Sequence, residues 1–122
     1  MMNNIIRTSK LVKTSEVVGA DEPSQTESDL VSLISSSNSV MRTLAARNFK
    51  YYPEHLSTLL NRLAIEVDES VMMEVKNTIL ELAVNEPANQ IIERKVREIS
   101  NSKDNDELLE RTCQDILSRL NN

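Results

Sequence analysis

The chain has 122 residues, of which 39% are hydrophobic and 27% are charged, as is typical of one globular domain. A single Gly, no Trp, and two Tyr and one Phe as the only aromatic residues disfavour a β-sheet protein, because sheets favour aromatic side chains and their turns favour Gly. The net charge of -5 disfavours nucleic acid as a partner, and no apolar run exceeds three residues, so no membrane-spanning segment is expected.

Residues 1–26 are predicted to form a flexible N-terminal tail and linker, and residues 27–122 a helical-repeat domain. The tail contains the only Gly and a turn-rich stretch at 19–24. Its apolar pairs recur every six residues, a spacing that scatters them around a helix and forms no face. A segment that adds to a partner as a strand, or that folds against the domain, is the alternative.

Six helices are expected after residue 26, because apolar residues recur there with the helical period and helix start signals separate the periodic stretches. Their expected ranges are 27–35, 39–51, 54–66, 69–84, 87–100 and 105–120. Asn38, or a neighbouring Ser, is predicted to cap the second helix, and Asp68 the fourth. Asp104, with Glu107 three residues later, resembles a capping box for the sixth. A Pro in the first turn opens the third and fifth helices.

The short links between these ranges predict that consecutive helices pack as antiparallel neighbours, either in a bundle or in a stack of hairpins. An internal repeat favours the stack. A shift of 31 residues aligns the second helices of the first two hairpins and places Val40, Leu44 and Phe49 on Val71, Val75 and Leu80. The last two helices form a third and looser copy, at a spacing of about 38 residues.

The second hairpin resembles a HEAT repeat, in which an apolar first helix is followed by an acidic or Asn cap and a Val near the start of the second helix. The residues that carry the resemblance are Leu56, Leu59, Leu60 and Leu63, then Asp68 and Val71, then Val75, Ile79 and Leu82. The basic residue that often follows this Val is present as Arg42 in the first hairpin but is replaced by Met72 and Met73 in the second. The family's Pro inside the first helix is missing.

The resemblance covers residues 27–120 and implies an all-α, right-handed stack of about three antiparallel helical hairpins, a HEAT-like α-solenoid. A compact helical bundle is the alternative fold. In a solenoid of this kind the second helices of the hairpins lie side by side and form one wall of the stack.

Winding each second helix at about 100° per residue predicts which side chains are buried and which face solvent. The expected core positions are Val40, Met41, Leu44, Ala45 and Phe49 in the first hairpin, Val71, Val75, Ile79 and Leu82 in the second, and Leu109, Cys113, Ile116 and Leu120 in the third. The solvent-facing positions predict a second-helix wall. Its candidate partner-binding residues are Arg42, Arg47, Lys50, Met73, Glu74, Asn77, Glu81, Arg111 and Asp115.

This pattern predicts a non-catalytic adaptor or scaffold that binds another protein through the second-helix wall, is cytoplasmic, and is a monomer or weak homodimer. The wall would change from basic, through acidic with an exposed Met73, to mixed charge, which would select a partner of complementary charge. A small acidic chaperone or regulatory subunit that acts as a homodimer is the alternative.

No catalytic residue, cofactor or metal site is predicted. His55 is the only histidine, and adjacent helical residues such as Glu54 and His55 point about 100° apart, so they do not form a positioned acid and base. The sequence also lacks a glycine-rich phosphate loop. Cys113, the only cysteine, is expected to be a small buried hydrophobic residue.

Overall fold

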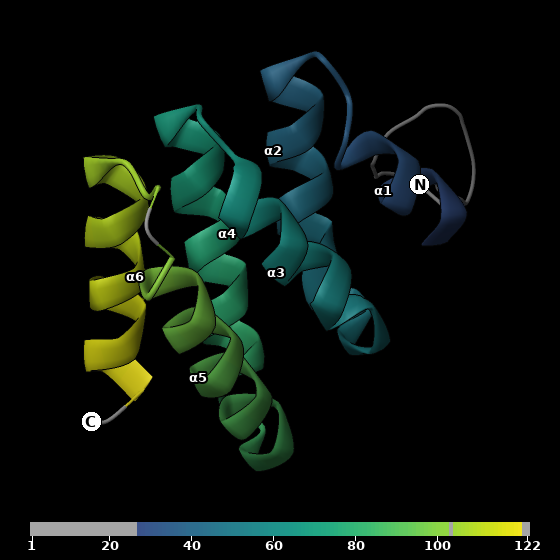
Figure 1. The fold of residues 1–122 in the computed structure, drawn as a ribbon. Helices are drawn as coiled ribbons and strands as arrows, with labels where there is room; N and C mark the ends of the chain where they lie inside the picture. The colour runs from purple at the N-terminus through teal and green to yellow at the C-terminus, as the bar shows by residue number, and fades with distance from the viewer. Residues whose placement is uncertain (1–26, 103, 121–122) are drawn as a thin grey trace. The chain divides into compact units, whose positions relative to one another are not determined.

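A computed structural model describes residues 27–102 and 104–120, which form six α-helices, two 3₁₀ helices and no strand (Figure 1). The helices are α1 (Glu27–Leu33), α2 (Ser39–Asn48), η1 (Phe49–Tyr51), η2 (Pro53–His55), α3 (Leu56–Ile65), α4 (Glu69–Leu82), α5 (Glu86–Ser100) and α6 (Glu107–Leu120). For the described residues, the prediction of six helices and an all-α fold is confirmed. The tail predicted for residues 1–26 lies outside the described residues.

Backbone contacts divide the chain into two units, residues 1–30 and 31–122. The described part of the first unit is the N-terminal part of α1, with Leu30 buried. The second unit contains the last residues of α1 and all of α2 to α6. None of the described helices combines the length and the apolar character needed to cross a membrane.

Side-chain caps fix where four helices of the second unit begin. Asn38, Asp68, Asn85 and Asp106 each accept a hydrogen bond from a backbone N–H in the first turn of α2, α4, α5 and α6 respectively. The first two are predicted caps. The capping box predicted at Asp104 is wrong, because α6 begins at Glu107 and the carboxylate of Asp106, directly before it, accepts the bond at 2.8 Å.

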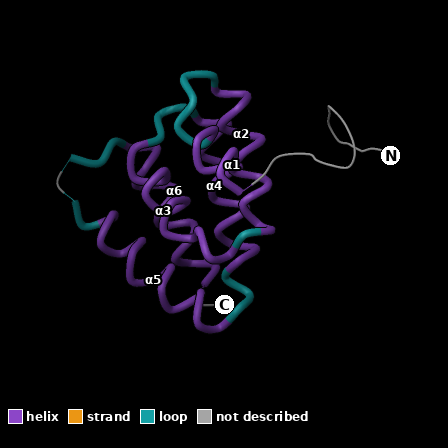
Figure 2. Tube along the Cα trace, turned by 90° about the vertical axis from the view of Figure 1, so that its right-hand side faces the viewer, coloured by secondary structure: helices purple, strands orange, loops and turns teal. Residues whose placement is uncertain are grey.

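The second unit has two layers of helices (Figures 1 and 2). In one layer α4 lies between α2 and α6, and in the other α3 packs beside α5. The short link after α3 folds α4 back against it, and α6 likewise packs against α5, so each of these pairs is a helical hairpin. The central helix α4 contacts α2, α3, α5 and α6.

Ion pairs between neighbouring helices show that α2, α4 and α6 run in the same direction. Arg42, early in α2, bonds Glu66 just before α4, whereas Arg47, late in α2, lies 3.3 Å from Glu74 in the middle of α4. In the same way α6 begins near the start of α4 and continues alongside it, because its residues 111 and 115 pair with residues 69 and 76 of α4. Helix α4 therefore has a parallel neighbour on each side, α2 and α6.

The core lies between the two layers and is almost entirely aliphatic. Its fully buried members include Leu59, Leu60 and Leu63 of α3, Val71, Met72, Val75 and Ile79 of α4, Ile92 and Val96 of α5, and Cys113 and Ile116 of α6. Burial of one such side chain contributes about 1.5–3 kcal/mol, which far exceeds what an exposed ion pair supplies. Leu82 and Leu120, which were expected in the core, are only partly buried.

The predicted core positions of the first hairpin's second helix are confirmed for Ala45 and Phe49, which are 0% and 1% exposed, and wrong for Val40, Met41 and Leu44, which are 61%, 38% and 37% exposed. The buried residues within α2 itself are Ala45 and Ala46. The two Ala side chains let the α2 backbone approach α4 closely, and the Thr78 hydroxyl of α4 donates a buried hydrogen bond of 2.9 Å to the Ala46 carbonyl. Helix α2 is therefore oriented so that Ala45 and Ala46 face α4, whereas Val40 and Leu44 face solvent.

Candidate functional site

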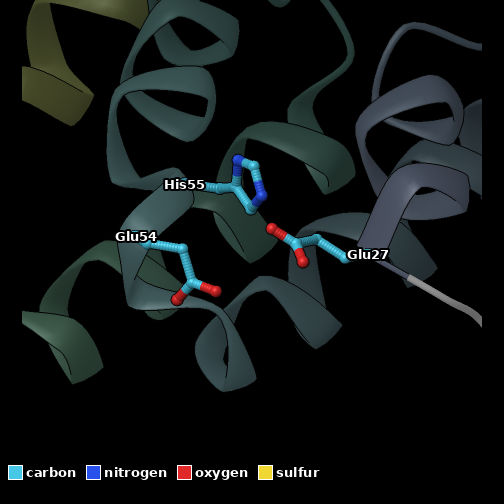
Figure 3. Close-up of side chains that lie close together, drawn as sticks. All are labelled: Glu27, Glu54 and His55. Carbon is cyan, nitrogen blue, oxygen red and sulfur yellow. The ribbon is translucent and has the colours of Figure 1, made fainter.

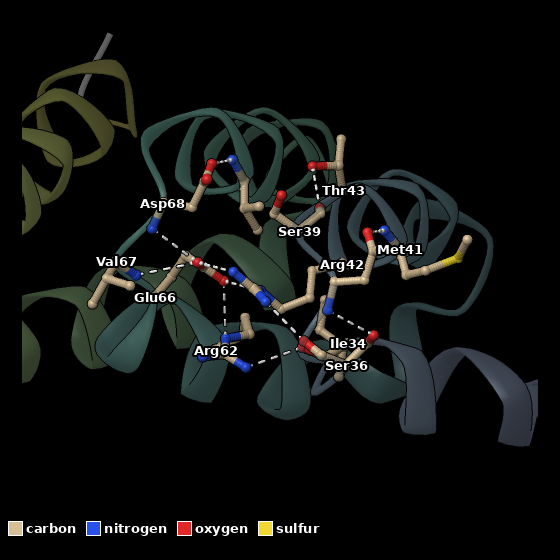
Figure 4. Close-up of polar contacts among 12 residues, drawn as sticks. Ile34, Ser36, Ser39, Met41, Arg42, Thr43, Arg62, Glu66, Val67 and Asp68 are labelled. Atoms are coloured by element: carbon tan, nitrogen blue, oxygen red, sulfur yellow. Dashed lines mark hydrogen bonds and ion pairs between the residues drawn. The ribbon is translucent and has the colours of Figure 1, made fainter.

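A buried carboxylate joins the first helices of the second unit (Figure 4). Glu66 follows the last residue of α3, and its side chain is 0% exposed. The guanidinium of Arg42 on α2 donates two parallel hydrogen bonds to it, from Nε to Oε1 and from Nη2 to Oε2, both at 3.0 Å. Arg62 Nε on α3 lies 3.2 Å from Oε1 without the alignment of a hydrogen bond. Two arginines thus neutralise one buried carboxylate.

The same cluster also bonds the backbone of two links, the one between α3 and α4 and the one after α1. Glu66 Oε2 accepts hydrogen bonds from the backbone N–H groups of Val67 and Asp68, at 3.1 and 3.0 Å, in the link that starts α4. The remaining guanidinium N–H groups reach back to the segment after α1. Arg42 Nη1 donates to the Ser36 carbonyl at 2.7 Å, and Arg62 Nη1 donates to that of residue 34 at 3.1 Å.

Burial of the Glu66 carboxyl raises its pKa, but the hydrogen bonds from Arg42 and from the Asp68 backbone, with the charges of both arginines, outweigh burial and bring the pKa below the ordinary glutamate value. The hydrogen bond to Glu66 correspondingly raises the pKa of Arg42, so the arginine stays charged. The cluster is therefore a fully ionised salt bridge at neutral pH. It performs a structural role and offers no group poised to exchange a proton.

Arg42 is consequently misplaced in the predicted second-helix wall. The helical pattern put it on the solvent face, whereas its side chain is only 12% exposed and is bonded to Glu66. Glu66 itself was not singled out from the sequence. Its spacing of four residues from Arg62 is visible there, but the contact with Arg42 spans 24 residues and arises only when α2 packs against the α3–α4 link.

The other predicted wall residues on α2 and α4 lie on the outer side of the α2–α4–α6 layer. Met73 is 52% exposed, and Asn77 lies one turn further along α4 and is also exposed. Arg47 and Glu74 form an ion pair across the two helices at 3.3 Å, with 51% and 22% of their side chains exposed. The four residues therefore occupy adjoining positions on the wall.

Three further predicted residues lie at the margins of the wall. Asp115 of α6 accepts a hydrogen bond of 2.8 Å from Lys76 of α4. This bond, together with the hydrogen bond from Arg119, lowers the pKa of the Asp115 carboxyl despite its partial burial. Arg111 lies 3.9 Å from Glu69 near the starts of α6 and α4. Lys50 is in η1, where its ammonium lies 5.3 Å from the centre of the Tyr51 ring, a cation–π contact.

Glu81 lies at the far end of the predicted set. It is exposed in the last turn of α4, four residues after Asn77 and therefore about 6 Å further along the helix axis. There it borders a groove with the starts of α3 and α5. The sequence pattern could not separate the two positions, because both lie on solvent-facing arcs of the same helix.

Glu54 and His55 project from η2, with a carboxylate oxygen of Glu54 and a ring nitrogen of His55 within 4.8 Å of each other (Figure 3). The His55 ring packs edge to face against the buried Phe49 ring, with centroids 6.3 Å apart. Glu27, also drawn there, belongs to the other unit of the chain. Cys113 is 0% exposed, and burial raises the pKa of its thiol to about 11, so the thiolate required of a nucleophile is suppressed at neutral pH.

The isosteric substitution Glu66→Gln tests whether the buried cluster holds the second unit together. Removal of the negative charge leaves Arg42 and Arg62 facing a neutral side chain, so we expect the free energy of unfolding to fall by about 3 kcal/mol. Glu69→Gln is the matched control, because Glu69 is 70% exposed and its loss should cost less than about 1 kcal/mol. Urea unfolding followed by circular dichroism measures both, and equal losses would show that the cluster is unimportant.

The lowered pKa of Glu66 also predicts a pH dependence. Because the folded state holds the carboxyl pKa below its value of about 4.5 in the unfolded chain, the stabilisation is complete above pH 4.5 and is lost as the pH falls from there through the folded pKa. We expect the difference in unfolding free energy between wild type and Glu66→Gln to be constant from pH 7 to 5 and to shrink below 4.5. A difference that stays constant below 4.5 would contradict this assignment.

No protein-family model matches the sequence, and no curated protein or solved structure is significantly similar to it.

Proposed function

We propose that the chain is a short HEAT-like solenoid that binds another protein through its second-helix wall, the outer side of α2, α4 and α6. The parallel course of these three helices supports the solenoid over an up-and-down bundle. In such a bundle, neighbours along the chain are antiparallel and α4 would have no parallel neighbour on each side. Here α4 runs beside both α2 and α6 in the same direction.

The observation that carries the proposal is the exposure of large apolar side chains on the wall. Val40 is 61% exposed and Leu44 37% on α2, and Met73 is 52% exposed on α4. On α2 the residues that face inward are Ala45 and Ala46. Exposed apolar side chains that are flanked by charges are typical of protein-binding surfaces.

Charge on the wall would set which partner is accepted. The ion pair between Arg47 and Glu74 lies between the apolar residues of α2 and those of α4, and a second pair, Lys76 with Asp115, lies between α4 and α6. Both signs are thus displayed on either side of Met73. A partner with apolar side chains and a matching alternation of charge would meet this surface, whereas a uniformly charged one would be repelled at one of the pairs.

Affinity capture with the full chain as bait tests the wall. We expect Val40→Asp and Met73→Asp to reduce capture of the wild-type partner about tenfold or more, because each places a charge where an apolar anchor is buried in the complex. Both side chains are exposed, so helical content measured by circular dichroism should not change.

Charge reversal provides the matched control. Arg47→Glu with Glu74→Arg restores the pair between the helices in inverted order, so a purely structural role predicts normal capture, whereas recognition of the charges predicts loss. The corresponding double reversal at Glu93 and Arg97, an exposed pair on α5 in the other layer, should leave capture unchanged. Undiminished capture by all the wall variants would refute the proposed surface.

A further inference from the structure

A groove at the C-terminal end of α4 forms a second surface, which borders the second-helix wall at Glu81. It lies where the end of α4 meets the beginnings of α3 and α5, and its volume is about 930 Å³. Apolar side chains, among them Pro53, Leu56, Val84 and Ile91, make up most of its lining.

The apolar lining is unusually accessible. Val84, in the link between α4 and α5, is 87% exposed, and Ile91 on the first turns of α5 is 44% exposed. Leu56 at the groove floor is 7% exposed. The groove therefore combines one buried apolar side chain with two exposed ones, which suits a short chain segment whose apolar side chains cover the exposed pair.

The charged side chains that line the groove are all negative. Glu54 and Glu81 line it, and the described residues of its lining include no Lys, Arg or His. Neither carboxylate has an ion-pair partner among the residues that the structure describes. The C-terminal end of α4, whose last turn carries no basic residue, adds the negative end of a helix dipole, and Glu86 in the first turn of α5 offsets the positive end of that helix.

We propose that this groove binds a short segment of a partner protein in which one or two aliphatic or aromatic side chains lie next to a Lys or Arg. The apolar side chains would cover Val84, Ile91 and the Leu56 floor, and the cation would lie between Glu54 and Glu81. Charge complementarity selects this occupant, because an acidic segment would be repelled by both carboxylates and a purely apolar one would leave them without a partner.

Selection of random displayed peptides of about twelve residues on the full chain tests the proposal directly. We expect the enriched peptides to combine an apolar residue with an adjacent Lys or Arg. Fluorescence polarisation of an enriched peptide should then show at least about tenfold weaker binding for Val84→Asp and Ile91→Asp, and weaker binding for Glu81→Lys. Binding to the wild type should weaken as salt is raised, since part of the affinity is electrostatic.

Two control variants separate this groove from general charge and from the wall. Glu98→Lys makes the same charge change as Glu81→Lys at an exposed position on α5 outside the groove lining, and Val40→Asp alters the wall; both should bind the peptide as wild type does. Loss of peptide binding in Val40→Asp would overturn the groove assignment in favour of the wall.

Other outcomes also overturn the proposal. They are enrichment of acidic peptides, failure to enrich any peptide, and binding that no groove variant weakens. Sedimentation analysis tests whether a second copy of the chain occupies the groove instead. A wild-type dimer that Val84→Asp and Ile91→Asp convert to a monomer would show that the groove is a self-association surface and not a peptide site.

Discussion

The buried carboxylate of Glu66 is the constraint on which the arrangement of α2, α3 and α4 depends. A carboxylate without exposed surface is stable only when its charge is neutralised and its lone pairs are satisfied, and here two guanidinium groups and two backbone N–H groups meet those needs. Because those partners come from two helices and the link to a third, satisfying one side chain fixes the relative positions of all of them. The arginines extend the connection to the segment after α1.

The orientation of α2 follows from the same cluster. Arg42 must point inward to reach Glu66, and Ala45 and Ala46, one turn further along the helix, then face α4. Val40 and Leu44 are left on the opposite side of the helix, where they are exposed. The buried salt bridge and the exposed apolar residues of the proposed wall are therefore two results of one rotation of α2 about its axis.

The sequence predicts the helices well because their signals are local. The caps at Asn38 and Asp68 and the period of Val71, Val75 and Ile79 depend only on residues within a turn or two, and each is present in the structure. The face of α2 could not be predicted in this way. A helical wheel ranks residues by hydrophobicity and places Leu44 inside, whereas the close approach of α4 requires small residues and the Glu66 charge requires Arg42.

The candidate surfaces were likewise predictable from the sequence only in part. A wheel identifies Met73, Glu74 and Glu81 as side chains off the core face of α4, but only the fold shows that Glu74 pairs with Arg47 of α2 and that Glu81 borders a groove with α3 and α5. The groove could not be predicted from the sequence, since its lining combines two separated stretches of the chain, residues 53–57 and 81–91. The two proposed surfaces thus use different parts of one helix.

Hydrogen–deuterium exchange on wild type and Glu66→Gln tests the central role of Glu66 most directly, because it reports local stability helix by helix. The account predicts that the substitution speeds amide exchange most in α2 and at Val67 and Asp68, whose contacts the carboxylate holds, and least in α5 and α6. Unchanged exchange in α2, or an equal increase in all five helices from α2 to α6, would contradict the claim that this side chain positions α2 against the second hairpin.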